Sequence, residues 1–159
     1  MAQQLTPTWI NALAFTIEVR MNEEKPVRVL LVEDSLPVRR RIRSLIEESG
    51  AGDIVGEAGT LAASRVLFRE REPQAVVLDL QLEDGTSYDF LLEIKRTRPA
   101  CVVIVLTSFP MPECRRCCLE SGADYFFDKS HEFERVPEVL AELRRSPRSQ
   151  LSNRKSDSR

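Results

Sequence analysis

The chain has 159 residues, enough for one globular domain with a sizeable core. Apolar residues make up 42% and charged residues 30% of it, which excludes disordered and membrane-embedded classes. Its net charge of -2 is unevenly spread, because residues 144–159 carry +5 and leave -7 on residues 1–143. The body of the protein is therefore acidic.

Two features predict a cytoplasmic protein. The first 19 residues contain no Lys or Arg, so the basic region of a secretory signal is missing. Three of the four cysteines crowd into five positions, unlike the spread cysteines of a disulfide framework. No apolar run reaches the roughly 18 residues that a membrane-spanning helix needs.

Residues 1–26 are predicted to be an N-terminal extension. Trp9, Ile10 and other apolar residues occur there without a clean period, and Met21 stands six residues before the first expected strand. The segment is a docking helix, a disordered extension, or an overlong translation start with the working protein beginning at Met21.

From residue 27 onward, five short apolar runs alternate with amphipathic segments, which predicts one domain over residues 27–145. The runs are 27–32, 53–58, 74–80, 101–107 and 123–128. Most are Val, Ile and Leu runs without polar alternation, as in strands covered on both faces of a parallel sheet.

Helical patterns lie between these runs. The first carries a stripe of Val38, Ile42, Leu45 and Ile46, with Ser35 as a candidate N-cap, and the later ones span about 60–71, 87–98, 112–121 and 136–145. This alternation predicts an α/β fold with right-handed crossovers and helices on both faces of an open parallel sheet.

Residues 146–159 are predicted to form a disordered basic tail. Leu151 is their one large apolar residue, too little apolar surface to offset the entropy of ordering. Contact of this tail with nucleic acid is the weaker alternative.

Three carboxylates follow strands of the predicted sheet. Glu33 and Asp34 close the first strand, and Asp79 lies near the end of the third. Ligands bind outside the carboxyl ends of strands in such sheets. Two charges ~4 Å apart repel by about 4 kcal/mol at a surface-like dielectric, so three carboxylates together need a cation or protons. Oxygen ligands of this kind suit Mg²⁺.

Two further strand ends carry matching groups. The fourth strand ends in the hydroxyls of Thr107 and Ser108, and the fifth ends just before Lys129. A carboxylate nucleophile, a metal ion, a hydroxyl and a lysine around one point form a phosphoryl-transfer site.

The segments VLLVEDS, VVLDLQL, IVLTS and GADYFFDKS resemble the signature segments of the response-regulator receiver domain of two-component signalling. The resemblance covers about residues 27–145 and implies a flavodoxin-like fold with five parallel strands in the order 2-1-3-4-5. It implies that Asp79 is the phosphoacceptor and that Asp34 binds Mg²⁺ directly. Glu33 would bind the ion mainly through water, and the backbone carbonyl of Gln81 would be a further ligand.

The same resemblance assigns the switch. Thr107 would contact the phosphoryl group and Lys129 would pair with it, while Phe126 would be the aromatic residue that fills the space Thr107 vacates. The alternative for Phe126 is a plain core aromatic.

The implied function is that of a stand-alone, non-enzymatic regulator. It accepts phosphate from a histidine kinase or histidine phosphotransfer protein and acts on a downstream protein target. No membrane partner is expected, and DNA binding by the tail is the weaker alternative. Gln81 and Phe109 would border the water that attacks the phosphorylated form. The competing hypothesis is a pseudo-receiver that binds partners independently of phosphate.

Three positions depart from the family pattern. Ser130 and Glu83 stand where proline is usual, and Ser87 stands where glycine is usual. Without a proline at residue 130, the orientation of the Lys129 side chain is open. Glu83 and Ser87 likewise leave open the shape of the loop after Asp79.

Asp84, Gly85 and Thr86 resemble the end of the nucleophile loop of haloacid-dehalogenase-type phosphatases. Residue 82 would have to be the nucleophilic aspartate and is leucine. This enzymatic interpretation is rejected.

Cys114, Cys117 and Cys118 share one face of a predicted helix, which favours a buried stripe. Structural zinc needs four ligands, and the single histidine, His131, lies beyond a predicted strand, so a zinc site is not favoured. A thiol switch is the remaining alternative.

Arginines cluster at the start of the first helix. They form either a solvated face or a docking surface for the phosphodonor. The candidates for docking are Arg39, Arg40 and Arg43.

Overall fold

The computed structural model of the protein describes residues 10, 12–13 and 25–145. Ile10, Ala12 and Leu13 are helical, and the side chains of Ile10 and Leu13 are exposed. The other residues of the predicted extension up to residue 24, Met21 among them, and the whole predicted tail lie outside the described residues.

Five parallel strands form the sheet. They are β1 (Val27–Val32), β2 (Gly52–Ala58), β3 (Ala75–Leu78), β6 (Val102–Thr107) and β7 (Tyr125–Asp128). Their order across the sheet is β2-β1-β3-β6-β7, and every pairing is parallel. The predicted strand order is therefore confirmed.

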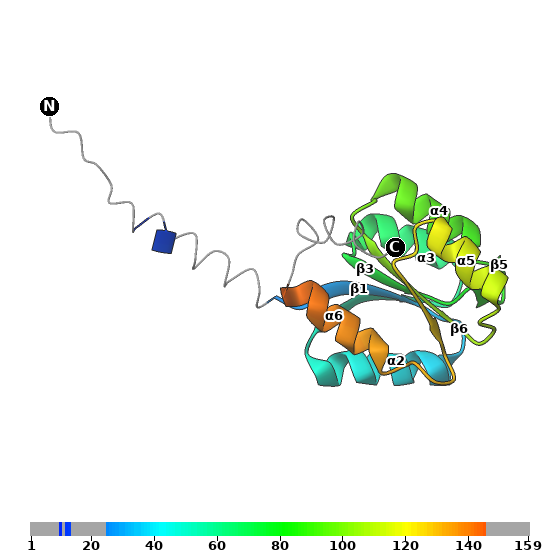
Figure 1. The fold of residues 1–159 in the computed structure, drawn as a ribbon, viewed down its shortest axis with the longest axis horizontal. Coiled ribbons are helices and arrows are strands. Elements are labelled where there is room, and N and C mark those ends of the chain that lie inside the picture. Colours follow the sequence, from blue (N-terminus) through cyan, green and yellow to red (C-terminus); the bar gives the residue numbers. More distant parts are fainter. Residues whose placement is uncertain (1–9, 11, 14–24, 146–159) are drawn as a thin grey trace, which may run out of the picture.

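Helices cover both faces of this sheet (Figure 1). α2 (Leu36–Ser49) and α6 (Arg135–Arg145) pack on one face, and α3 (Leu61–Arg71), α4 (Tyr88–Thr97) and α5 (Pro112–Glu120) pack on the other. Among the described residues, no helix combines the length and apolar character needed to cross a membrane.

The central strands are buried on both faces, which explains their unbroken apolar sequence. Within β1, Val29 and Leu31 pack against α2 and α6, whereas Leu30 and Val32 pack against α3 and α4. Because successive side chains of a strand point to opposite faces, both sets must be apolar.

A short hairpin after β3 was not predicted. It consists of β4 (Gln81–Leu82) and β5 (Gly85–Thr86), and Gly85 at its turn adopts a φ of 133°, which favours glycine. Both carboxylate oxygens of Asp84 accept hydrogen bonds from the Leu61 amide at 3.0 and 2.8 Å. Asp84 thus holds the N-terminus of α3 and has a structural role.

The predicted cap of the first helix is only partly right. Ser35 occupies the N-cap position of α2, but its side chain makes no capping hydrogen bond. Its amide instead donates to Glu33 Oε1 at 3.0 Å. Ser35 therefore helps to fix a carboxylate at the end of β1.

Candidate functional site

Three carboxylates meet at the carboxyl edge of the sheet, as the sequence predicts. Glu33 and Asp34 follow β1, and Asp79 follows the neighbouring strand β3. One carboxylate oxygen of each lies within 4.8 Å of the other two. Glu33 and Asp79 are 1% and 6% exposed, so solvent screens their charges poorly.

Lys129 enters the same cluster from the end of β7. Its Nζ atom lies 2.7 Å from Asp79 Oδ2 and 2.5 Å from Glu33 Oε2. The Lys129 amide donates to the Thr107 carbonyl oxygen at 2.9 Å, which extends the pairing of β7 with β6 to this residue. The sheet register therefore aims the ammonium at the carboxylates.

The charges in this cluster do not balance. Three ionised carboxylates and one ammonium leave a net charge of -2. Burial raises the pKa of Glu33, and the negative Asp79 raises it further, although Lys129 and the Ser35 amide act in the opposite direction. A divalent cation with oxygen ligands would neutralise the cluster, and Mg²⁺ fits this donor set.

Hydrogen bonds fix the orientation of Asp79. Its Oδ1 atom accepts from the Gln81 amide at 3.1 Å, and its amide donates to the Val32 carbonyl oxygen at 3.0 Å. The Ser87 hydroxyl, which is fully buried, donates to the Asp79 carbonyl oxygen. The serine at this usual glycine position thus anchors the backbone that carries Asp79.

Residues 29–141 match the family description "Response regulator receiver domain". The chain belongs to this family. It is a receiver domain of the two-component response regulators.

Curated relatives share about 30% of their residues with this receiver. The KDP operon transcriptional regulatory protein KdpE of Escherichia coli is 34% identical over 116 residues, which cover 73% of this chain and 49% of KdpE. The photosynthetic apparatus regulatory protein RegA of Cereibacter sphaeroides is 28% identical over 112 residues, covering 70% of this chain and 60% of RegA. The chain thus spans about half of KdpE and 60% of RegA.

Solved structures show the same fold. The signal receiver domain of the putative response regulator NarL from Mycobacterium tuberculosis superposes with a TM-score of 0.70 at 20% identity, covering 77% of this chain and 98% of that one. A CheY-like receiver domain protein from Methanospirillum hungatei gives 0.66 at 19% identity, covering 84% and 99%. A further relative, the DNA-binding transcriptional activator DevR/DosR of Mycobacterium tuberculosis, is 28% identical over 128 residues, which cover 80% of this chain and 58% of that protein. The relatives therefore do not support the expectation that DNA is no partner.

The predicted switch residues lie on the two strands that follow β3 across the sheet, Thr107 on β6 and Phe126 on β7. Thr107 is 2% exposed at the end of β6, and its Oγ1 atom accepts a hydrogen bond from the Phe109 amide at 3.2 Å. Phe126 is 2% exposed and belongs to the core under α3, α4 and α5. Arg115 of α5 donates to the Phe126 carbonyl oxygen at 2.8 Å and stacks over its ring.

The loop after Lys129 is ordered without the usual proline. The Ser130 amide donates to Asp128 Oδ1 at 2.8 Å, and the Asp128 amide donates to Glu132 Oε2 at 2.8 Å. Proline has no amide hydrogen and could not make the first of these bonds. The loop after Lys129 therefore contains a hydrogen bond that the usual proline would exclude.

Two of the three arginines proposed for docking are engaged within the domain. Arg39 is half-buried and donates to the Glu33 carbonyl oxygen at 2.9 Å, and Arg43 pairs with Glu57 at 2.8 Å. Arg40 is exposed. A docking role for this group stays a prediction, and Arg39 also supports the backbone of the acidic cluster.

The buried-stripe interpretation of the three α5 cysteines is wrong for one of them. Cys118 is buried and Cys114 is half-buried, but Cys117 is exposed. Cys117 follows Cys114 by three residues, which places it at the edge of the buried face of the helix and not in the core.

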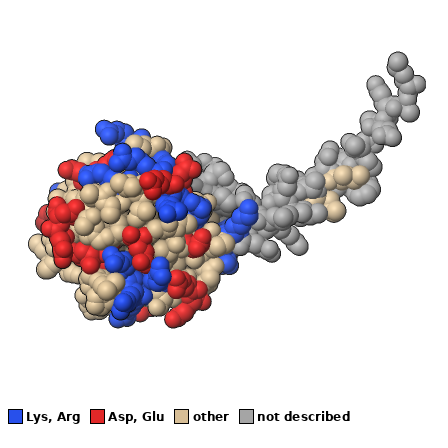
Figure 2. All heavy atoms as spheres, turned by 180° about the vertical axis from the view of Figure 1, so that it is seen from behind, with Lys and Arg blue, Asp and Glu red and all other residues tan. Residues whose placement is uncertain are grey.

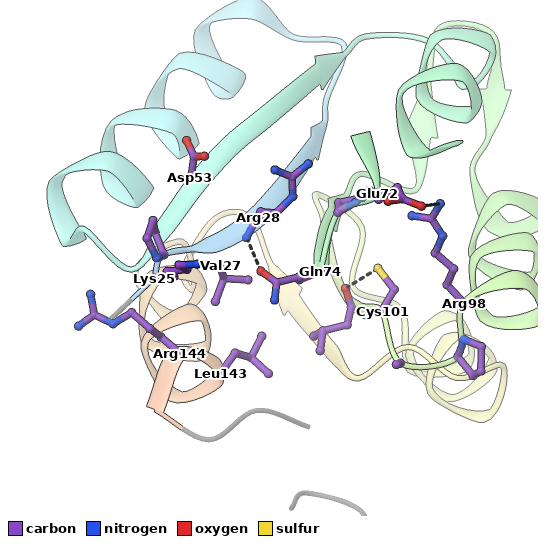
Figure 3. Close-up of a pocket in the computed structure, with 15 residues that line it drawn as sticks. Lys25, Val27, Arg28, Asp53, Glu72, Gln74, Arg98, Cys101, Leu143 and Arg144 are labelled. Atoms are coloured by element: carbon purple, nitrogen blue, oxygen red, sulfur yellow. Dashed lines mark hydrogen bonds and ion pairs between the residues drawn. The ribbon is translucent and has the colours of Figure 1, made fainter. Parts of the chain in front are cut away.

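A hollow of the receiver lies at the opposite edge of the sheet (Figure 3). It has a volume of about 890 Å³ and is bordered by the starts of β1 and β6 and the end of α6. Figure 3 shows Arg28 bonded to Gln74 and Arg98 paired with Glu72 along its wall. Because the carboxylates follow the other ends of the strands, this hollow is separate from the acidic cluster.

Two contacts of the site were missed by the sequence analysis. Neither the bond from Ser87 to the Asp79 carbonyl nor the clamp of Arg115 on Phe126 could be read from spacing alone, because each joins residues of different elements. For the first contact, the sequence offered one indication, namely a serine at residue 87 where the family usually has glycine.

Proposed function

We propose that Asp79 accepts a phosphoryl group from a phosphohistidine of a histidine kinase or a histidine phosphotransfer protein. The observation that carries this proposal is the meeting of Glu33, Asp34 and Asp79 within 4.8 Å, with the Lys129 ammonium in contact with two of them. Membership of the receiver family supports the same function.

The residues of the cluster fit Mg²⁺. Carboxylate oxygens of Glu33, Asp34 and Asp79 and the backbone carbonyl of Gln81 would hold the ion, in keeping with the residual charge of -2. Bound Mg²⁺ would neutralise charge on the oxygens of the transferring phosphoryl group.

The side chains of the domain have defined tasks in the transfer. The Asp79 carboxylate attacks phosphorus, the P–N bond to the donor imidazole breaks, and the electron pair of that bond stays on the imidazole nitrogen. The Gln81 amide holds the Asp79 carboxylate in orientation, and Lys129 supplies positive charge next to it.

The response to phosphorylation would start at Thr107. Its hydroxyl oxygen accepts from the Phe109 amide, and its hydrogen would be donated to a phosphoryl oxygen. The Phe126 ring and the Arg115 side chain that contacts it would then respond on β7 and α5. The changed surface engages a downstream protein, which makes the domain a protein-binding switch in a phosphorelay.

The test is labelling by a small phosphodonor. The wild-type protein, incubated with acetyl phosphate and Mg²⁺, is expected to gain one acid-labile phosphoryl group by intact mass. Asp79→Asn and removal of Mg²⁺ by chelation should each abolish the gain. Asp53→Asn, a matched change at an exposed residue of β2, should leave it intact. Labelling that persists in Asp79→Asn overturns the assignment.

The alternative is a pseudo-receiver that works without phosphate. It predicts Mg²⁺ binding without labelling of the wild-type protein, so the same experiment separates the two functions. DNA binding has less support, since basic and acidic side chains are interspersed on the face shown in Figure 2 and do not gather into one basic surface.

A further inference from the structure

Three thiols of α5 border a small pocket beside the end of β6. Cys114, Cys117 and Cys118 line this pocket, which has a volume of about 270 Å³ and is also bordered by Thr107 and Phe109. All three are free thiols. The pocket therefore presents several soft ligands to anything small enough to enter it.

Two of these sulfur atoms are direct neighbours. Cys114 and Cys118 are one helical turn apart and share a face of α5. Burial, together with the hydrogen-bonded Cys114 thiol, raises the pKa of Cys118 to about 12. The Cys118 thiol therefore keeps its proton at neutral pH until a thiol-binding ion displaces it.

Helix geometry disfavours a disulfide between this pair. Cβ atoms one turn apart on a helix are roughly 5–6 Å from each other, whereas a disulfide needs about 3.5–4.5 Å. A single bridging ion spans the longer gap, because each metal–sulfur bond adds roughly 2.3 Å. A bound ion, unlike a disulfide, can therefore join the two sulfurs without distorting the helix.

The ligand set also discriminates among ions. Structural zinc takes four ligands, but among the described residues the one group of three metal-binding side chains within 4.8 Å of one another is Glu33, Asp34 and Asp79. Thiolates suit monovalent copper, zinc and iron–sulfur clusters. Because structural zinc and iron–sulfur clusters take four ligands, a pair of thiolates favours monovalent copper.

We propose that Cys114 and Cys118 bind one monovalent copper ion as a two-sulfur clamp, with the exposed Cys117 at the pocket mouth as a ligand during entry. On binding, two S–H bonds break and two Cu–S bonds form, and both protons pass to solvent. No atom changes its oxidation state. The site does not depend on phosphorylation of Asp79.

The test is an anaerobic titration of the full-length reduced protein with monovalent copper, in competition with a chromogenic copper(I) chelator. Wild type is expected to withdraw one equivalent of copper, whereas Cys114→Ser and Cys118→Ala withdraw none. Cys101→Ala, which removes the one cysteine outside the cluster, should still withdraw one equivalent. Binding should weaken by roughly 100-fold per unit fall in pH, the dependence for two released protons.

Any of three results would contradict the two-sulfur site. They are a wild-type protein that withdraws no copper, a Cys114→Ser variant that still withdraws one equivalent, and binding that is lost in Cys117→Ser alone. Cys114 is half-buried, so its serine variant should keep the circular dichroism spectrum of wild type and decides the question even if Cys118→Ala unfolds.

Discussion

The Lys129 ammonium lies 2.7 Å from Asp79 Oδ2 and 2.5 Å from Glu33 Oε2, so a single cation pairs with two carboxylates that follow neighbouring strands. A metal ion bound to the same carboxylates would supply positive charge there as well. Because two positive charges in one small site repel, Lys129 limits how tightly the cluster can hold Mg²⁺.

The substitution Lys129→Met tests this competition. Methionine keeps most of the side-chain volume and removes the charge, so Mg²⁺ affinity is expected to rise by roughly tenfold, or about 1.4 kcal/mol. Isothermal titration calorimetry measures it. Lys129→Arg, which keeps the charge, should leave the affinity near that of wild type. An unchanged or weaker affinity in Lys129→Met would show that Lys129 and the metal do not compete.

Ser87→Ala is expected to destabilise the fold although it removes one atom. The Ser87 hydroxyl is fully buried and donates to the Asp79 carbonyl oxygen, so its loss leaves a buried acceptor without this donor. The cost is about 1–3 kcal/mol in the free energy of unfolding, measured by urea denaturation.

Ser108→Ala is the matched control for this change. Ser108 is exposed at the end of β6, so its substitution should stay within about 0.5 kcal/mol of wild type. Equal effects of the two changes would mean that the bond to Asp79 contributes nothing.

Gly52→Ala tests the packing of β2 under α2 and α6. A Cβ atom at residue 52 would lie 2.7 Å from Ile46 Cγ2, closer than carbon atoms normally approach, and 3.0 Å from Leu140 Cδ1, which is also a tight contact. The overpacking should lower the free energy of unfolding by about 1–3 kcal/mol. Asp53→Ala, at an exposed neighbour on the same strand, should change it little. A neutral Gly52→Ala would mean that the two helices move apart without cost.

The sequence predicts the sheet well because its strands are buried on both faces. Leu30 and Leu31 point to opposite faces and are both in the core, which is why an unbroken apolar run was a sufficient signal. The two-residue strands β4 and β5 have no such run. They depend on the turn at Gly85 and on the bond of Asp84 to α3, which join residues that no local pattern connects.

The same contrast holds for the site. Glu33, Asp34 and Asp79 could be placed together because the ends of parallel neighbouring strands meet at one edge. The contacts of Ser87 and Arg115, and the exposure of Cys117, depend on side-chain directions set by packing between elements. Periodicity carries no information about these directions.

Ser130→Pro would restore the residue that is usual in the family and is expected to raise the pKa of Asp128. The Ser130 amide is the main cause that lowers this pKa below its ordinary value of 3.8, followed by the His131 side chain. A lowered carboxyl pKa stabilises the folded state at pH above 3.8, and this contribution is lost as the pH falls through the folded-state value. Proline removes the amide donor, so less of this stabilisation remains at neutral pH.

Carboxyl carbon chemical shifts followed against pH by NMR measure this pKa directly. Ser130→Ala keeps the amide and should leave the Asp128 midpoint below 3.8, close to wild type, whereas Ser130→Pro moves it upward. A midpoint that is the same in the proline and alanine variants would remove the Ser130 amide as the cause. The position of the loop after Lys129 would then depend on its other hydrogen bonds, which include the bond from the Asp128 amide to Glu132 and the bond from the Glu132 amide to the Asp128 carbonyl oxygen.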